Sequence, residues 1–253
     1  MDYNIKSVER AFEIIEAIAL KSKLPSELSK ELNINKTTLH RFLATLHDLG
    51  YIDKRSDNSI SLSQSFINLG VKARNQYNIV AISRPYLKSL AEEFEESALL
   101  ATFNGNISQY EDKVESSRAV RIVFDSGGTA PAHAVASGKI FLASLEHDSL
   151  LEYMDRVPFT AYTRNTIIEK EKLIDEVAKI RELGYAVDNE EYEIGLQGFA
   201  CPVKDADGKV IRALCVAGIA NRIKDKNNKD KIKSALLKAS SEISSKMGYQ
   251  SPK

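Results

Sequence analysis

The segment from Lys36 to Asp48 carries the side chains of this chain that are best suited to contact DNA bases. At about 100° per residue of a helix, Thr37, Arg41 and Ala44 share a face that lies opposite the apolar residues. An arginine at such a position can donate two parallel hydrogen bonds to O6 and N7 of guanine. The spacing therefore predicts a helix that enters the major groove, with Arg41 as its principal base-reading residue.

Polar neighbours of Arg41 would position this helix on the DNA. Threonine hydroxyls and a lysine ammonium can hydrogen-bond phosphate oxygens, which fixes orientation without reading sequence. Two further cations, Lys54 and Arg55, lie beside a polar turn and suit contacts with phosphates next to the groove. The predicted DNA-contacting residues are Lys36, Thr37, Thr38, His40, Arg41, Thr45, Lys54 and Arg55.

Three helices and a pair of strands would hold these side chains in place, and the pattern of the first 62 residues predicts these five elements. The first helix has apolar residues at spacings of three and four, behind a candidate cap: Ser7, then Val8, Phe12, Ile15 and Ala19. Pro25 suits the first turn of the second helix, and the third begins behind Asn35 and ends at Gly50. Strands 51–54 and 59–62 would form the wing, so residues 1–65 are predicted to be a winged helix-turn-helix domain.

The charge of the chain constrains this hypothesis. Lys plus Arg number 35 and Asp plus Glu number 35, and a neutral protein is no general polyanion binder. The first 62 residues are also neutral, with nine basic and nine acidic side chains. DNA binding must therefore come from local arrangement, and a winged-helix module that binds a protein partner remains an alternative.

The remainder of the chain mixes helices and strands. A linker helix is predicted from Phe66 to about Tyr77 within a linker of residues 66–80, followed by a second domain of residues 81–253. Its predicted helices cover residues 84–95, 131–145, 169–183 and 230–247, and its predicted strands cover 98–103, 121–124, 199–203 and 210–217, with Asn104-Gly105 turning the first strand back. The pattern predicts an α+β fold in which helices pack on an antiparallel sheet.

Composition limits where this protein works. Apolar residues make up 43% of the chain, which is enough for a packed core. No apolar run is long enough to span a bilayer, and the first six residues lack the apolar stretch of a signal peptide. We therefore predict a cytoplasmic protein with no membrane partner. Two cysteines and four scattered histidines give no disulfide framework and no zinc spacing, so no metal and no cofactor are expected.

Two short patterns could suggest catalysis, and both are incomplete. Gly138-Lys139 lacks the preceding glycine and the following Ser or Thr of a phosphate-binding loop. Ser137 lies four residues after His133, but an orienting acid and an oxyanion site are not evident. A metabolite-binding enzyme is thus a weak alternative. Cys201 and Cys215 flank a predicted hairpin and could lie near each other, although buried cysteines are more often small core residues than redox sensors.

A collinear series of motifs resembles the IclR family of bacterial regulators. The series covers nearly the whole chain and comprises Ser7 to Ala11, Ser26 to Leu28, Lys36 to Leu46, Ala81 to Ala91, Asp112 to Ser116, Pro131 to Ala143, Tyr162 to Ile167 and Arg181 to Glu191. The resemblance implies a C-terminal GAF-like effector-binding domain and a homodimer formed through the N-terminal domain, or, as is frequent in the family, a dimer of dimers, on a palindromic operator in double-stranded DNA. It also implies, for most members, repression of a catabolic operon that is released by a small organic metabolite, either acid-like or hydroxylated, and no enzymatic activity.

The family's effector pocket can be carried over to this chain residue by residue. It falls on Ile122, Ala136, Ser137, Asp188, Leu196, Gly198, Cys215 and Ala217. Relatives that bind small carboxylates often have serines where this chain has Cys215 and Ala217, and Asp188 would repel a carboxylate. The resemblance therefore implies a small-molecule effector that is less polar, or richer in hydroxyls, than a two- or three-carbon acid.

Overall fold

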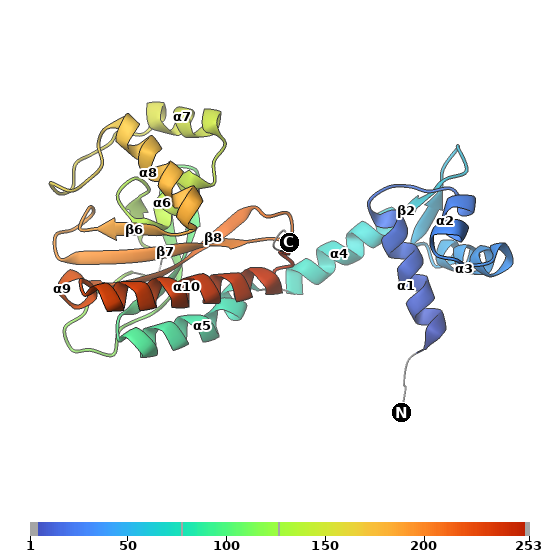
Figure 1. Ribbon diagram of the computed structural model, residues 1–253, viewed down its shortest axis with the longest axis horizontal. Helices are drawn as coiled ribbons and strands as arrows, with labels where there is room; N and C mark the ends of the chain where they lie inside the picture. The colour runs from blue at the N-terminus through green and yellow to red at the C-terminus, as the bar shows by residue number, and fades with distance from the viewer. Residues whose placement is uncertain (1–4, 77, 126, 251–253) are drawn as a thin grey trace. The chain divides into compact units, whose positions relative to one another are not determined.

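The computed structural model describes residues 5–76, 78–125 and 127–250 (Figure 1). The chain divides into two compact units, Met1–Tyr77 and Asn78–Lys253, and each unit has a hydrophobic core of its own. No helix of the described part is long and apolar enough to cross a membrane.

The N-terminal unit consists of helices around a small two-stranded sheet. Its elements are α1 (Lys6–Ala19), α2 (Pro25–Glu31), α3 (Lys36–Asp48), β1 (Ile52–Lys54), β2 (Ile60–Leu62) and α4 (Gln64–Gln76). The two strands pair antiparallel, with Ile52 opposite Leu62. Helices α1, α2 and α3 bury Ile14, Leu28 and Leu39 against one another. Three helices followed by a strand pair form the predicted winged helix-turn-helix.

Local signals explain the ends of α3 but not the start of α1. The Asn35 side chain accepts a hydrogen bond from the backbone N–H of Thr38 at 2.8 Å, and Gly50 follows the helix with φ of 76°. The expected Ser7 cap of α1 is wrong, because the helix already begins at Lys6 with Ile5 as its uncapped N-cap residue. The predicted linker helix is α4, and its expected last residue, Tyr77, lies outside the described residues.

The core also covers less of α1 than the periodicity predicted. Ile14, Ile15 and Ile18 are buried, whereas Val8 is 50% and Phe12 is 56% exposed. The three-helix core therefore contacts the C-terminal half of α1, and the apolar residues of its N-terminal half remain on the surface.

The C-terminal unit is built on a six-stranded antiparallel sheet with the order β5-β4-β3-β8-β7-β6. Its strands are β3 (Ser97–Phe103), β4 (Ile107–Val114), β5 (Thr129–Pro131), β6 (Ala186–Asn189), β7 (Leu196–Lys204) and β8 (Val210–Ile219). Its helices are α5 (Ile79–Phe94), α6 (Ala136–Ala143), α7 (His147–Arg156), α8 (Lys170–Leu183), α9 (Ala220–Ile223) and α10 (Lys226–Lys246). Helices α5 and α10 cover one face, while α6 and α8 lie on the other (Figure 1). This is the expected α+β architecture.

Several predicted elements of this unit differ from the observed ones. Residues 121–124 form no strand, and the edge strand is β5, in which Pro131 pairs with Ile107. Proline suits an edge strand because it cannot donate a ladder hydrogen bond. Because Pro131 belongs to β5, helix α6 begins only at Ala136 rather than at Pro131. Helices α7 and α9 and strand β6 were not predicted. Helix α9 and strand β6 have only four residues each, whereas α7 buries Leu150, Tyr153 and Met154 at helical spacing, a pattern that the sequence analysis missed.

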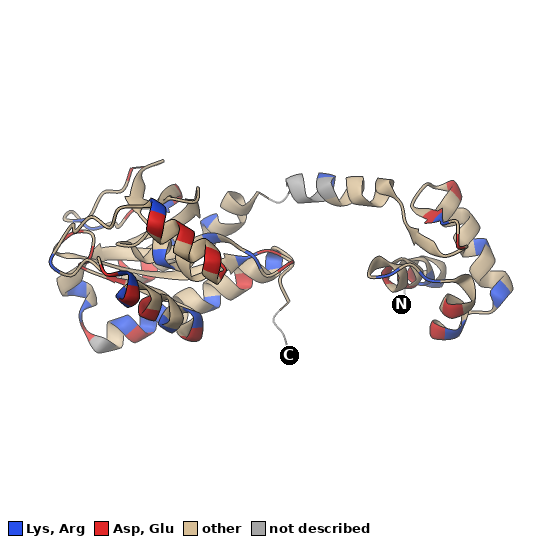
Figure 2. Ribbon diagram, turned by 90° about the horizontal axis from the view of Figure 1, so that it is seen from above, with Lys and Arg blue, Asp and Glu red and all other residues tan. Residues whose placement is uncertain are grey.

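Helices α5 and α10 both begin earlier than predicted, because polar caps precede them. The Asn78 side chain accepts from the backbone N–H of Val80 at 3.0 Å, ahead of the expected Arg84. Asp225 accepts from the backbone N–H of Asn228 at 3.2 Å, ahead of the expected Asp230. Both acidic and basic residues occur on the helices of each unit, as expected for a neutral chain (Figure 2).

Candidate nucleic-acid interface and ligand cavity

Helix α3 presents a polar surface on the side away from the core. Leu39, Leu43 and Leu46 are buried, which anchors one side of the helix. Thr38 is half-buried, and the other predicted contact residues of α3 are exposed, namely Lys36, Thr37, His40, Arg41 and Thr45. A firmly packed helix with an exposed polar side has the form required for insertion into a groove of DNA.

The cations of this surface remain available for an anionic partner. Within the described part of the chain, Lys36, Arg41, Lys54 and Arg55 form no ion pair with a carboxylate. Thr45 donates its hydroxyl hydrogen to the Arg41 carbonyl at 2.9 Å, so its oxygen can still accept a hydrogen bond.

Hydrogen bonds within the wing hold its tip in one conformation. Asp57 accepts from the backbone N–H and the hydroxyl of Ser59, at 2.9 and 2.6 Å, and these bonds lower the pKa of its carboxyl. Asn58 adopts a positive φ of 64°, a conformation that asparagine tolerates better than most residues. The exposed Lys54 and Arg55 are thereby held next to a defined turn.

An apolar groove lies between α1 and α3. It has a volume of about 560 Å³ and its lining includes Val8, Ala11, Arg41 and Leu49. Leu49 is 62% exposed. Half-exposed Val8 and Leu49 thus extend an apolar surface beside the polar face of α3.

In the C-terminal unit, a small cavity lies between α6 and the sheet. It holds about 20 Å³, which is room for about one water molecule. All the predicted effector residues except Ile122 line it, namely Ala136, Ser137, Asp188, Leu196, Gly198, Cys215 and Ala217. The other lining residues are Leu99, Tyr110, Phe124, Val135 and Phe199. Helix α6 and strands β3, β4, β6, β7 and β8 thus converge on one space.

Ser137 and Asp188 are among the polar residues that line this mainly apolar cavity. Ser137 shares a hydrogen bond of 2.8 Å with the buried hydroxyl of Ser108. Asp188 accepts the backbone N–H of Glu191 at 2.8 Å, and burial raises the pKa of its carboxyl to about 7. Because Asp188 is close to half-protonated near neutral pH, its carboxyl can act as either donor or acceptor. The sequence did not single out Ser108, which lies on β4, 29 residues before Ser137.

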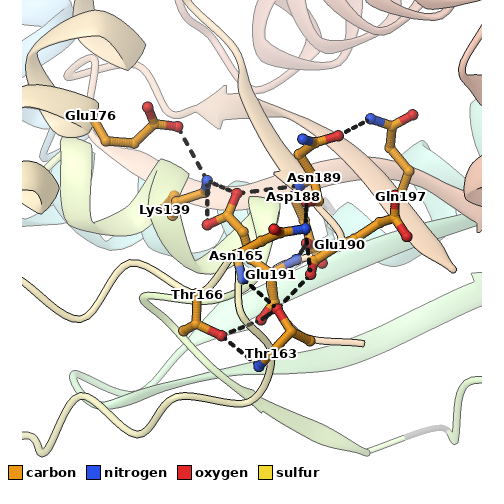
Figure 3. A network of polar contacts seen from close by, with 10 residues as sticks. All are labelled: Lys139, Thr163, Asn165, Thr166, Glu176, Asp188, Asn189, Glu190, Glu191 and Gln197. Atoms are coloured by element: carbon orange, nitrogen blue, oxygen red, sulfur yellow. Dashed lines mark hydrogen bonds and ion pairs between the residues drawn. The ribbon is translucent and has the colours of Figure 1, made fainter. Parts of the chain in front are cut away.

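A buried ion-pair network adjoins Asp188 (Figure 3). The Lys139 ammonium donates to both carboxylate oxygens of Glu191, at 2.7 and 3.0 Å, and to Glu176 at 3.1 Å. The Glu191 carbonyl accepts from the Thr166 hydroxyl at 2.6 Å. This network holds the loop after β6, and therefore Asp188, against α6. The sequence gives little sign of this network. Lys139 follows a run of small residues, and the acidic residues Glu190 and Glu191 follow shortly after Asp188.

Ile122 lies outside the cavity, in an adjoining cleft of about 410 Å³. Tyr110, Phe124 and Leu196 line both spaces and form the wall between them. The rings of Tyr110 and Phe124 meet edge to face, with centroids 5.4 Å apart. The Lys113 ammonium donates to the Phe124 carbonyl, which ties the loop that carries Phe124 to β4.

The catalytic and redox alternatives find no support in this geometry. Ser137 bonds to Ser108, while His133 Nε2 lies 3.1 Å from the Thr160 carbonyl. Cys201 packs in the core beneath α5 and α10, whereas Cys215 packs on the opposite face of the sheet. The sheet separates the two thiols, and burial raises both of their pKa values.

Comparison with known proteins identifies both units. Residues 71–245 match the family model "Bacterial transcriptional regulator IclR C-terminal", and residues 7–56 match the "IclR helix-turn-helix domain". Over 248 residues the chain is 30% identical to the HTH-type transcriptional regulator KdgR of Dickeya chrysanthemi, covering 97% of this chain and 81% of that protein. It is 27% identical over 244 residues to the acetate operon repressor of Salmonella typhimurium, covering 94% of this chain and 89% of that protein.

The fold agrees with these matches. The crystal structure of the Thermotoga maritima IclR protein superposes with a TM-score of 0.65 at 28% identity, and the match covers 97% of this chain and 100% of that one. Along the chain, the helix-turn-helix match precedes the match to the IclR C-terminal domain. This chain therefore belongs to the IclR family of bacterial transcriptional regulators, a family of DNA-binding proteins rather than enzymes.

Proposed function

We propose that this chain is a ligand-responsive repressor of a catabolic operon, which a small organic metabolite releases from its operator in the cytoplasm. The observation that carries the proposal is the combination, in one chain, of a polar helix face with unpaired cations and a separate cavity with polar groups. The relatedness to an acetate operon repressor supports the sign of the regulation. Residues 1–65 would bind DNA and residues 81–253 would bind the effector, while residues 66–80 would link these two domains.

The DNA-binding residues remain those proposed from the sequence. Arg41 would read guanine, and Thr37, Thr38, His40 and Thr45 would contact base edges or phosphates. Lys36, Lys54 and Arg55 would neutralise phosphates, which adds affinity but no sequence information. All of these residues except half-buried Thr38 are exposed, and the four cations form no ion pair in the described structure; both observations support this assignment.

The apolar surface of α1 supports a homodimer. Val8 and Phe12 lie one helical turn apart and are 50% and 56% exposed, and Leu49 continues the surface. Burying such residues against a second copy is favourable, at roughly 25 cal/mol per Å² of apolar area. A twofold dimer would place two α3 helices on a palindromic operator with half-sites about one helical turn apart, or a multiple of it. Two such dimers would make a dimer of dimers.

For an effector to release the protein from its operator, it must bind the DNA-bound and DNA-free states of the protein with different affinities. A molecule at Asp188 and Ser137 would alter the packing of α6 against the sheet, because both residues line the cavity. Its effect on operator affinity is limited to its differential affinity, typically about 1–3 kcal/mol. The linker helix α4 would transmit the change to the DNA-binding domain.

Fluorescence anisotropy of the purified chain tests this function. The protein is titrated into labelled DNA from the intergenic region upstream of its own gene, and into scrambled DNA, over a salt series. We expect the specific DNA to bind about a thousandfold or more tightly than the competitor. Equal binding to both would contradict the proposal and would favour the protein-interaction module.

A further inference from the structure

We propose that the cavity and the adjoining cleft form one two-part effector site, and that it takes a hydroxyl- or amino-headed molecule with an apolar body rather than a carboxylate. This inference rests on the proposed function, since it names the ligand to which the regulator responds. The cavity alone, at about 20 Å³, holds no more than a water-sized group. The cleft, at about 410 Å³, falls in the range of small-molecule sites.

Three residues lie at the boundary between the two spaces. Tyr110, Phe124 and Leu196 line both the cavity and the cleft. Phe124 lies in a segment without regular secondary structure, so it is not restrained by a strand ladder. Rotation of its ring would join the cavity to the cleft, with Asp188 at the inner end and Ile122 at the outer one.

The charges of the lining select against an anion. Among the described residues that line the two spaces, none is Lys, Arg or His, and three are acidic, namely Asp125, Asp188 and Glu193. The nearby Lys139 ammonium is already bound by Glu191 and Glu176, so it offers no free charge to a ligand. A carboxylate in this site would lose its hydration without gaining a cationic partner, and desolvation of an unpaired charge is costly.

The polar and apolar groups instead suit a neutral or cationic head. The Asp188 carboxyl can accept a hydrogen bond from a hydroxyl or an ammonium, and the Ser137–Ser108 pair can exchange its hydrogen bond with the same head. Tyr110, Phe124 and Tyr192 provide aromatic faces in the cleft. Such faces pack well against flat apolar bodies and also attract cations.

Three molecules of one skeleton test this inference. Phenylacetate, 2-phenylethanol and 2-phenylethylamine share a phenyl ring and differ in the charge of the head. They are titrated by calorimetry into the full chain at about pH 8, where Asp188 is mostly ionised. We expect the alcohol or the amine to bind at least tenfold more tightly than the acid. Tighter binding of the alcohol would indicate a neutral effector, and tighter binding of the amine would indicate a cationic one.

Variants locate the binding. Ile122→Ser, in the cleft, should weaken the better ligand at least fivefold, because an apolar contact with the ring is lost. Asp188→Asn should reduce the preference for alcohol or amine over acid at least fivefold. Ile168→Ser is the control, because it makes the same substitution at an isoleucine that is 50% exposed and lines neither space. It should leave all affinities unchanged.

The remaining outcomes overturn the inference. Tightest binding of phenylacetate would show that the site takes anions, and an unchanged Ile122→Ser affinity would show that the cleft is not part of it. If none of the three molecules binds at millimolar concentration, the proposed ligand class is wrong. Operator binding of the same preparation, measured by anisotropy, keeps each of these failures distinct from failure of the proposed function.

Discussion

The Lys139 ammonium, which is fully buried, donates to both carboxylate oxygens of Glu191, at 2.7 and 3.0 Å. The two residues lie 52 positions apart and join α6 to the loop after β6. Burying two charges costs hydration, and the pair offsets that cost only while both partners remain. The pair therefore acts as a structural tie whose disruption should be far more costly than loss of a surface ion pair.

Removing one partner of this pair should destabilise the C-terminal unit. Lys139→Met leaves Glu191 buried without its main cation, so we expect the free energy of unfolding to fall by about 3–5 kcal/mol. Urea denaturation measures the loss. Lys170→Met is the control, because Lys170 pairs with Asp155 at the surface, and such a pair contributes about 0–1 kcal/mol. Equal losses in the two variants would show that the buried pair is not a tie.

Arg41→Ala should reduce sequence discrimination without affecting the fold. Loss of a forked contact with guanine costs about 1–3 kcal/mol of specific binding, or roughly a factor of 5 to 150. Arg55→Ala should instead weaken specific and scrambled DNA alike and lower the salt dependence, as expected for a phosphate contact. Anisotropy with both DNAs separates the two cases, and exposed Lys209→Ala in the C-terminal unit is the control. Normal discrimination by Arg41→Ala would exclude it as the reading residue.

Stability should depend on pH through Asp188. Burial raises the pKa of its carboxyl from 3.8 to about 7 in the folded state. The folded protein therefore keeps a proton that the unfolded chain has already lost, and the free energy of unfolding falls as pH rises from about 4 to 7. Glu191 beside it titrates in the same direction, because burial also raises its pKa, while Lys139 opposes both shifts.

Asp188→Asn isolates this contribution. The amide oxygen can still accept from the Glu191 N–H, but the side chain no longer ionises. Relative to the unsubstituted protein, we expect the variant to gain about 2 kcal/mol of stability between pH 5 and pH 7. Urea titrations at several pH values measure it, and parallel pH profiles for the two proteins would contradict the assignment to Asp188.

A methyl group at Gly138 should not fit. Its Cβ would overlap the Cα and carbonyl oxygen of Ala132, so Gly138→Ala should cost about 3 kcal/mol or more by forcing α6 away from that segment. Gly70→Ala provides the control, because nothing lies within 4 Å of a Cβ there. Alanine at that helical position should be neutral or stabilise α4 by up to about 1 kcal/mol. Thermal unfolding of both variants distinguishes steric overlap from a general effect of the substitution.

The proposed dimer should depend on the exposed face of α1. Phe12→Glu places a charge in the apolar surface formed with Val8, so we expect the dimer dissociation constant to rise at least tenfold in sedimentation experiments. Leu20→Glu is the control, because Leu20 follows α1 and is 99% exposed. A dimer unaffected by Phe12→Glu would place the interface elsewhere.

The DNA-binding domain could be predicted from the sequence alone, because its signals are local. The Asn35 cap, the Gly50 end and the spacing of Leu39, Leu43 and Leu46 all act within one helix, and the structure has that helix at Lys36–Asp48. The family resemblance likewise predicted a set of cavity residues, because they belong to recurring motifs. Their role in ligand binding remains a prediction.

The contacts between distant segments could not be predicted from the sequence, because they depend on how the elements pack in three dimensions. The Lys139–Glu191 pair, the Ser108–Ser137 contact and the separation of Cys201 from Cys215 each depend on which sheet face or helix packs against which. The same holds for Ile122, which lies in the cleft because residues 121–124 join no strand. Local propensity acts over a turn of helix or a hairpin, whereas burial and desolvation arise only when segments far apart in the chain come into contact.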